Sequence, residues 1–230
     1  MRNDGRAAGA LRPITIQRRF TAAPGGSVLW TQGRTIVLAT ASLTPEVPEW
    51  FSPDRPGGWL TAEYVMLPAA TPQRKAWPKI GHTDSRGTEI QRLIGRSLRA
   101  VIDLSKLGRN TLAVDCQVLQ ADGGTRTASI CAAYVAVADA LTRGESRGAL
   151  TDQLAAVSVG VVKGEVLLDL DYSEDSKAEV DLNVAVTAGG RFVEVQGSAE
   201  NGGGFDRTRL DAMLDLAASG CKMLMEMQSR

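Results

Sequence analysis

The sequence is poor in the residues on which many enzyme mechanisms depend. Among its 230 residues there is a single histidine, His82, and there are three cysteines, Cys116, Cys131 and Cys221. A mechanism that depends on a histidine general base or on a histidine-based zinc site is therefore almost excluded. The cysteines are widely spaced and lie in apolar segments, which favours buried, reduced thiols over metal ligands or a disulfide framework.

Long apolar runs and net charge are also lacking. No apolar run is long enough to span a membrane, and the first residues, Met-Arg-Asn-Asp-Gly-Arg, do not resemble a signal peptide. We therefore expect a cytoplasmic protein without membrane contact. The formal charge is zero, yet residues 1–115 hold 16 basic and 9 acidic side chains, whereas residues 116–230 hold 10 and 17. This split suits an anionic ligand beside a metal site, or oppositely charged surfaces that meet in an oligomer.

With 43% hydrophobic residues, the chain can bury a sizeable core, and its patterns place strands before helices in each half. Predicted strands cover residues 12–20, 27–30, 35–43, 59–67, 111–119, 155–162, 165–170, 178–186 and 191–195. Predicted helices cover residues 88–103, 125–141 and 206–227. This order favours an α+β architecture over a doubly wound sheet. We see no linker, so we expect one domain over residues 1–230, with a polar, mobile loop at residues 68–85.

One segment joins an apolar strand to an apolar helix through residues suited to holding a phosphate. It is Gln-Ala-Asp-Gly-Gly-Thr-Arg-Thr-Ala-Ser, residues 120–129. Gly123 and Gly124 let the backbone approach a ligand, and the helix start supplies free N–H groups. Arg126 adds a planar donor fork that matches phosphate oxygens in pairs. The alternative is an ordinary turn in which Thr125 is the N-cap of the helix.

A second cluster places six acidic side chains within thirteen positions, residues 169–181. Along the predicted strand there, Val180 and Leu182 point one way, while Asp181 and Asn183 point the other. Crowded carboxylates repel one another unless a cation lies among them, and magnesium is held by one or two carboxylates with water and substrate phosphate. The two clusters together favour metal-assisted phosphoryl transfer, and the alternative for the second is an acidic surface hairpin. Because GxxxxGK[ST] and a strand-linked GxGxxG are absent, a nucleoside-triphosphate kinase or a Rossmann dehydrogenase is disfavoured.

Taken together, the motifs resemble those of the bacterial ribonuclease PH family. Its members are phosphate-dependent 3′-exoribonucleases that trim transfer RNA precursors, and they are related to polynucleotide phosphorylase and the exosome ring subunits. The resemblance covers almost the whole chain and implies a fold similar to that of the second domain of ribosomal protein S5. The matching stretches are Leu11-Arg-Pro, Trp59-Leu-Thr-Ala-Glu-Tyr64, Glu89-Ile-Gln-Arg-Leu-Ile-Gly-Arg96, residues 119–129 and Glu194-Val-Gln-Gly197.

The resemblance also implies roles for individual residues. The residues that match the family's site for inorganic phosphate are Arg86, Gly124, Thr125 and Arg126. The residues that match its catalytic pair, which holds Mg²⁺ or Mn²⁺, are Asp175 and Asp181. The implied reaction is attack of phosphate on the last phosphodiester of an RNA 3′ end, with reversible release of a nucleoside diphosphate. The alternatives are a non-catalytic RNA-binding ring subunit and a metal-dependent phosphohydrolase.

Family members form homohexameric rings built as trimers of dimers, and here the sequence departs from the pattern. Where the family usually has three arginines in the loop at residues 68–85, this chain keeps Arg74 and has Ala69 and Trp77 at the other two positions. Ring stability and the grip on transfer RNA are thereby put in doubt. We expect Arg74 and Arg92 to contact RNA, and Trp77 to pack in a subunit interface rather than stack on RNA. Further guesses at RNA contacts are Arg2, Arg18 and Arg19.

Overall fold

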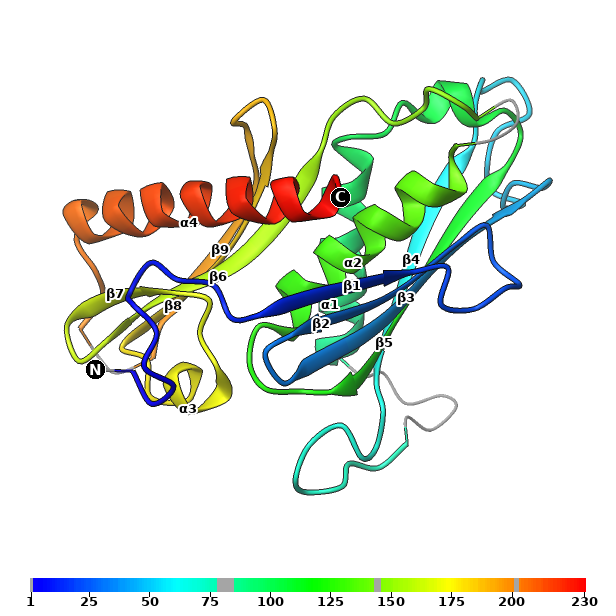
Figure 1. Cartoon of the computed structure of the whole chain (residues 1–230). Coiled ribbons are helices and arrows are strands. Elements are labelled where there is room, and N and C mark those ends of the chain that lie inside the picture. Colours follow the sequence, from blue (N-terminus) through cyan, green and yellow to red (C-terminus); the bar gives the residue numbers. More distant parts are fainter. Residues whose placement is uncertain (1, 78–84, 143–145, 201–202) are drawn as a thin grey trace.

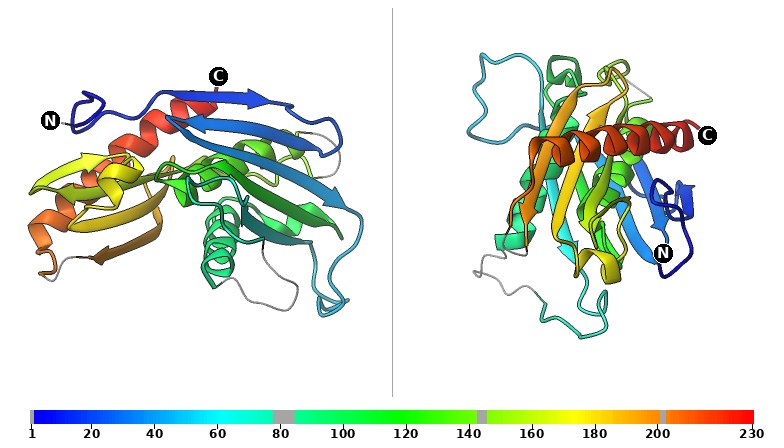
Figure 2. Two further views of the ribbon diagram at one scale, coloured as in Figure 1. Left: turned by 90° about the horizontal axis from the view of Figure 1, so that it is seen from below. Right: turned by 90° about the vertical axis from the view of Figure 1, so that its left-hand side faces the viewer.

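A computed structural model describes residues 2–77, 85–142, 146–200 and 203–230 of the chain. Two β-sheets lie side by side and are held together by helices (Figure 1; Figure 2). The strands are β1 (Ile14–Arg18), β2 (Gly26–Gln32), β3 (Thr35–Thr44), β4 (Trp59–Met66), β5 (Thr111–Gln120), β6 (Leu154–Val162), β7 (Glu165–Leu168), β8 (Val180–Thr187) and β9 (Phe192–Ala199). The helices are α1 (Ser85–Arg99), the 3-10 helix η1 (Leu104–Leu107), α2 (Thr125–Ala140), α3 (Tyr172–Asp175) and α4 (Arg207–Gln228).

The first sheet has the order β1-β2-β3-β5-β4, and the second has the order β7-β6-β8-β9. Neighbouring strands are antiparallel except β4 and β5, which run parallel and are connected through α1. Strand β6 is apolar and buried on both faces, as expected of a strand covered on both sides. In β8 the buried Val180 and Leu182 alternate with the half-buried Asp181 and Asn183, which confirms the predicted alternation.

Helix α2 lies between the two sheets and contacts β2 and β3 of the first as well as β6 of the second. Its sequence is rich in alanine and apolar all round, which is typical of a helix with no solvent-facing side. Helix α4 covers β6, β7 and β8, while α1 lies against β4. One apolar core therefore runs through both sheets, and the N-terminus of α2 is fixed where the sheets meet.

The α+β class is confirmed, and the predicted strands and helices all overlap observed ones. Helix α1 begins and ends a few residues before its predicted bounds, and η1 and α3 were not predicted. Residues 68–77 form no helix or strand, Ser85 already belongs to α1, and the remaining positions of the predicted loop, including His82, lie outside the described residues. In the described chain, no helix is long and apolar enough to cross a membrane.

The three cysteines are buried and unpaired, which confirms their prediction as structural thiols. Burial raises the pKa of Cys131 to about 12. Burial also raises the pKa of Cys116 and Cys221. Thiols in these surroundings stay protonated at neutral pH and are poor nucleophiles or metal ligands.

Candidate active site

The loop between β5 and α2, residues 121–124, exposes the N-terminus of a buried helix. Gly123 and Gly124 have φ angles of 76° and 62°, a conformation that glycine adopts without steric cost. Gly124 is the N-cap residue, so the cap position has no side chain with which to occupy the first N–H groups of α2. These groups and the helix dipole form a ready site for an anion.

Thr125 is the first residue of α2 and not its cap, so the alternative of a threonine-capped turn is wrong. Its Oγ1 accepts a hydrogen bond from the Tyr64 hydroxyl at 3.1 Å. Burial raises the pKa of Tyr64, although this hydrogen bond and the charges of Arg86 and Arg126 act in the opposite direction. Tyr64 therefore remains a donor that fixes Thr125, a role that sequence reasoning missed.

Arg126 extends from the first turn of α2 to a polar contact that joins three elements. Its Nη1 donates to Oε1 of Gln196 in β9 at 2.5 Å and to Oε1 of Glu89 in α1 at 3.2 Å. Gln196 Nε2 donates to the same Glu89 oxygen at 2.5 Å. Among the described residues, no hydrogen bond reaches the other two guanidinium nitrogens, which leaves one edge of the fork for an anion. Glu89 and Gln196 lie in the matched motifs, but their sequence gave no sign of this pairing.

Asp175 ends the short helix α3, and Asp181 lies at the start of β8. Burial and then the nearby charge of Asp181 raise the pKa of Asp175, while Arg86, Arg126 and Arg12 act to lower it. Asp181 Oδ1 also accepts a hydrogen bond from Ser198 Oγ at 3.2 Å. A carboxylate whose charged form is disfavoured by a second carboxylate nearby is suited to share a divalent cation with it.

Arg86 lies on the exposed first turn of α1. Its charge and that of Arg126 both act to lower the pKa of Asp175 and of Tyr64, so the two cations act on the same carboxyl and the same hydroxyl. The fold thus gathers residues that are up to 95 positions apart, from Arg86 to Asp181, at the N-termini of α1 and α2. The arrangement places two arginines that could bind an anion beside two carboxylates that could bind a metal ion.

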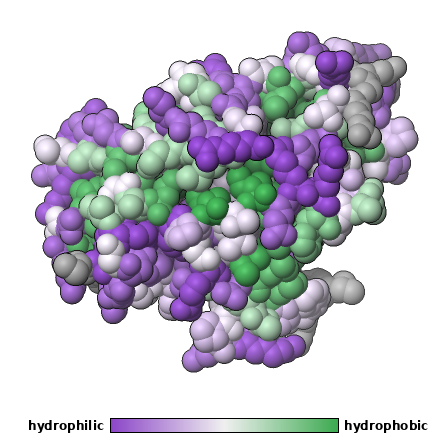
Figure 3. All heavy atoms as spheres, in the orientation of Figure 1, coloured by the Kyte–Doolittle hydropathy of each residue, from purple (hydrophilic) through white to green (hydrophobic). Residues whose placement is uncertain are grey.

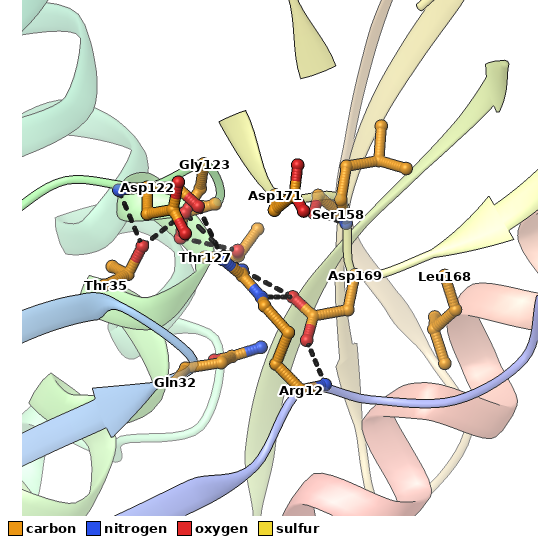
Figure 4. A network of polar contacts seen from close by, with 12 residues as sticks. Arg12, Gln32, Thr35, Asp122, Gly123, Thr127, Ser158, Leu168, Asp169 and Asp171 are labelled. Atoms are coloured by element: carbon orange, nitrogen blue, oxygen red, sulfur yellow. Dashed lines mark hydrogen bonds and ion pairs between the residues drawn. The ribbon is translucent and has the colours of Figure 1, made fainter. Parts of the chain in front are cut away.

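The other four acidic residues of the predicted cluster serve the fold. Glu174 pairs with Arg2 at 2.6 Å, and Asp169 pairs with Arg12 at 2.6 Å (Figure 4). Asp171 is the N-cap of α3 in a capping box, and Glu179 accepts a hydrogen bond from Gly164 N at 2.9 Å. No group of three or more potential metal-binding side chains occurs in the described part of the chain. A metal site here would rest on Asp175 and Asp181, with water and substrate oxygens completing it.

The two predicted RNA contacts, Arg74 and Arg92, lie in different parts of the molecule. Arg92 is exposed on α1 and, with Arg96, lines a surface depression of about 460 Å³ that begins at Ser85. Arg74 and Trp77 are exposed in the segment that follows β4, which projects from the body of the molecule (Figure 1). None of the interactions of the described residues joins Arg74 to the candidate site.

One of the further guesses at RNA contacts, Arg2, is wrong, whereas Arg18 is exposed but engaged within the fold. Arg2 is buried and donates to both carboxylate oxygens of Glu174, at 2.7 and 2.6 Å. Arg18 pairs with Asp139 of α2 at 2.5 Å and donates to the carbonyl of Gln228, which ties β1 to α2 and α4. Both arginines stabilise the fold, a use that the count of basic residues did not reveal. Arg19 is exposed, and nothing tests its role.

The fold is that of a family of RNA-degrading enzymes. The model described as the 3′ exoribonuclease family, domain 1, matches residues 10–142, and that of domain 2 matches residues 152–220. Ribonuclease PH of Nocardia farcinica is 55% identical over 234 residues, which cover 99% of this chain and 90% of that protein. Ribonuclease PH of Mycolicibacterium gilvum is 54% identical over 237 residues, which cover 99% and 89%. The chain therefore belongs to the ribonuclease PH family of 3′ exoribonucleases, as its motifs implied.

Solved structures agree with this membership. The Archaeoglobus fulgidus exosome with RNA bound to the active site matches with a TM-score of 0.81 at 25% identity, over 98% of this chain and 91% of that chain. Rice Rrp46 matches with a TM-score of 0.79 at 22% identity, over 99% and 98%. The second likeness concerns the fold alone.

Proposed function

We propose that this chain is a phosphate-dependent exoribonuclease that removes nucleotides one at a time from the 3′ ends of transfer RNA precursors in the cytoplasm. Inorganic phosphate is the nucleophile, and the products are nucleoside diphosphates. The observation that carries the proposal is the convergence of Arg86, Arg126 and the uncapped N-terminus of α2 on the side of the site that holds Asp175. Unpaired, buried cysteines are in keeping with a reducing compartment.

The chain's own residues account for the binding and orientation of phosphate. Gly124 and Thr125 offer backbone N–H groups, while Arg86 and Arg126 add charge-assisted hydrogen bonds. Held in this way, one phosphate oxygen is directed at the terminal phosphodiester, and the attack becomes effectively unimolecular. Because one phosphate ester is exchanged for an anhydride without water, the reaction is reversible. A hydrolase would not need the phosphate-binding half of this site.

The carboxylate pair supplies the other half. A magnesium or manganese ion bound by Asp175 and Asp181 would offset the charge that develops on the transferring phosphoryl group. The raised pKa of Asp175 suits it to carry a proton to the leaving 3′ oxygen. Ser198 orients Asp181 through their hydrogen bond.

One experiment separates this function from its alternatives. The protein is incubated with magnesium and a 3′-extended RNA, with and without inorganic phosphate, and the released nucleotides are identified. We expect nucleoside diphosphates only when phosphate is present. Monophosphates without phosphate would identify a hydrolase, and no release in either condition would favour a binding subunit.

A variant of Arg126 tests the phosphate site directly. Arg126→Ala should lower kcat/KM for phosphate on the order of 10²–10³-fold, because it removes a charged donor from the reacting group. Arg207→Ala is the matched control, since Arg207 is an exposed arginine of α4 that pairs only with Asp211 in the described chain. Both variants should retain the circular dichroism of the unmodified protein. Near-normal activity of Arg126→Ala would show that the phosphate site is misassigned.

We further propose that the enzyme works as a homohexameric ring, a trimer of dimers, that binds RNA through Arg74 and Arg92. Apolar residues lie open on the surface of the single chain, as Figure 3 shows for one face. Trp77 is 57% exposed, which supports its packing against another subunit. Light scattering should give the mass of six chains, and Trp77→Ala should shift that mass downward. A mass that Trp77→Ala leaves unchanged would contradict an interface role for Trp77.

A further inference from the structure

Arg12, in the segment before β1, is a buried residue that contacts both halves of the candidate site. Its Nη1 donates to the carbonyl of Asp122 at 2.6 Å, and its Nη2 lies 3.5 Å from the carbonyl of Gly123. Its Nε and Nη2 donate to Oδ1 of Asp169 at 3.1 and 2.6 Å. The first two contacts hold the loop at residues 121–124, here called the glycine loop. The last two hold Asp169, the first residue of the segment at residues 169–175 that ends at Asp175, here called the aspartate segment.

The position of Asp169 is fixed by its burial and by several hydrogen bonds. It is 1% exposed, and its Oδ2 also accepts a hydrogen bond from Arg12 N at 2.7 Å. Its backbone has a φ of 55°, an uncommon conformation for a residue other than glycine. Gln32 lies beside the pair in Figure 4 and also hydrogen-bonds to Asp169. The surroundings thus over-determine the position of one carboxylate.

The glycine loop is fixed from its other side by Thr35 at the start of β3. Thr35 Oγ1 donates to the carbonyl of Gly123 at 2.7 Å and accepts a hydrogen bond from Asp122 N at 3.0 Å (Figure 4). The loop also packs directly on the aspartate segment, since a Cβ atom at Gly123 would lie 2.6 Å from the carbonyl oxygen of Leu170. The two halves of the site are therefore separate loops that touch.

We propose that Arg12 is a positioning residue for phosphorolysis. Asp169 holds its side chain, and Arg12 in turn fixes the position of the glycine loop relative to Asp175, so that phosphate bound by the loop is correctly placed for the reaction. This inference rests on the proposed function. Arg12 does not itself reach the reacting atoms, because both of its ends are occupied by Asp169 and by the two loop carbonyls. The planar guanidinium donates in several directions at once, so it can contact Asp169 and the loop carbonyls together. A lysine has a single ammonium group and cannot make both sets of contacts in this geometry.

Two variants and a control test the proposal. Arg12→Lys keeps the charge beside Asp169 but gives up the fork, and Thr35→Val removes two hydrogen bonds to the loop with little change of shape. We expect Arg12→Lys to lower kcat/KM for phosphate by about 10- to 100-fold, the scale of a small misplacement of reacting groups. Thr35→Val should lower it by about three- to tenfold, as expected for lost hydrogen bonds. The KM for RNA should change by less than about twofold in both.

Arg34→Ala is the matched control, since Arg34 is 77% exposed and lies 3.6 Å from the Asp122 carboxylate at the rim of the same loop. It should leave all constants unchanged. Calorimetric titration with inorganic phosphate, without RNA, gives a second readout that does not need catalysis. If the unmodified protein binds phosphate but releases no diphosphates, the proposed function fails while this titration still tests Arg12.

Weaker phosphate binding in Arg12→Lys and Thr35→Val, with Arg34→Ala unaffected, would support the inference. Should Arg12→Lys fail to fold, as judged by circular dichroism, Thr35→Val decides by itself. Folded variants that bind phosphate as tightly as the unmodified protein would overturn the inference. So would an equal weakening in Arg34→Ala, because any substitution beside the loop would then have the same effect as loss of the Arg12 contacts.

Discussion

Two carboxylates that are adjacent in the sequence have different roles: Glu174 stabilises the fold, whereas Asp175 belongs to the candidate site. Glu174 is buried and accepts hydrogen bonds from Nε and Nη2 of Arg2, so it ties the N-terminal segment to α3. The pKa of Asp175 is raised, first by burial and then by the charge of Asp181. A raised carboxyl pKa means that the charged form is less favourable in the folded chain than in the unfolded one. Asp175 therefore lowers stability at neutral pH, as expected for a group retained for function.

Asp175→Asn should make the fold more stable and the enzyme much less active. The folded chain binds more protons at Asp175 than the unfolded chain in the window above the ordinary pKa of 3.8, so its stability falls as pH rises through the raised pKa. The variant lacks this loss, so its advantage should be present at pH 7 and vanish below the ordinary pKa. Denaturant unfolding with a chelator present, at both pH values, measures it. Activity should fall on the order of 10²–10³-fold.

Glu174→Gln, one residue earlier, provides the contrast. It leaves the Arg2 charge buried without its carboxylate, which should lower the free energy of unfolding by about 3–5 kcal/mol. Activity at a temperature where the variant is folded should fall much less than in Asp175→Asn. Equal stability changes in the two variants would show that burial and pairing do not distinguish these neighbours.

At the scale of elements, the glycine loop depends on contact with the aspartate segment as well as on its own backbone. Gly123 and Gly164 both have a φ of 76°, but only at Gly123 would a Cβ atom meet backbone, whereas at Gly164 it would meet open space. Gly164→Ala should cost about 1–2 kcal/mol for the left-handed conformation. Gly123→Ala should cost about 1–3 kcal/mol more because of overpacking and should also weaken phosphate binding. Equal unfolding midpoints for the two variants would contradict this contact.

Periodicity in the sequence was enough to predict every long element, because burial imposes its period on strands and helices. It missed α3, whose four residues are too few to show a period and whose capping box uses Asp171, which was counted only as part of the acidic cluster. The phosphate half of the site was indicated by glycines and Arg126. Arg12, Tyr64 and Gln196 were not found, because what makes them important is contact between segments far apart in the chain.

At the scale of the whole molecule, α2 is both part of the hydrophobic core and part of the candidate phosphate site. It is shared between the two sheets, and its N-terminus forms the phosphate side of the site. The two family models meet between residues 142 and 152, next to the C-terminal end of this helix. A unit boundary at that place would leave α2 with one face exposed. This is the physical reason for treating residues 1–230 as a single cooperative domain, which remains a prediction.

Unfolding of the two sheets should therefore coincide. All four tryptophans, Trp30, Trp50, Trp59 and Trp77, lie in the first half, so their fluorescence reports on the first sheet and its loops. Cys221 of α4 is buried against the second sheet, so its reaction with a thiol reagent in a protein lacking the other two cysteines reports on that half. At one protein concentration, both probes and far-ultraviolet circular dichroism should give the same midpoint in denaturant. A Cys221 that becomes reactive while tryptophan fluorescence is still native would mean that the second sheet unfolds separately and that the shared helix does not couple the halves.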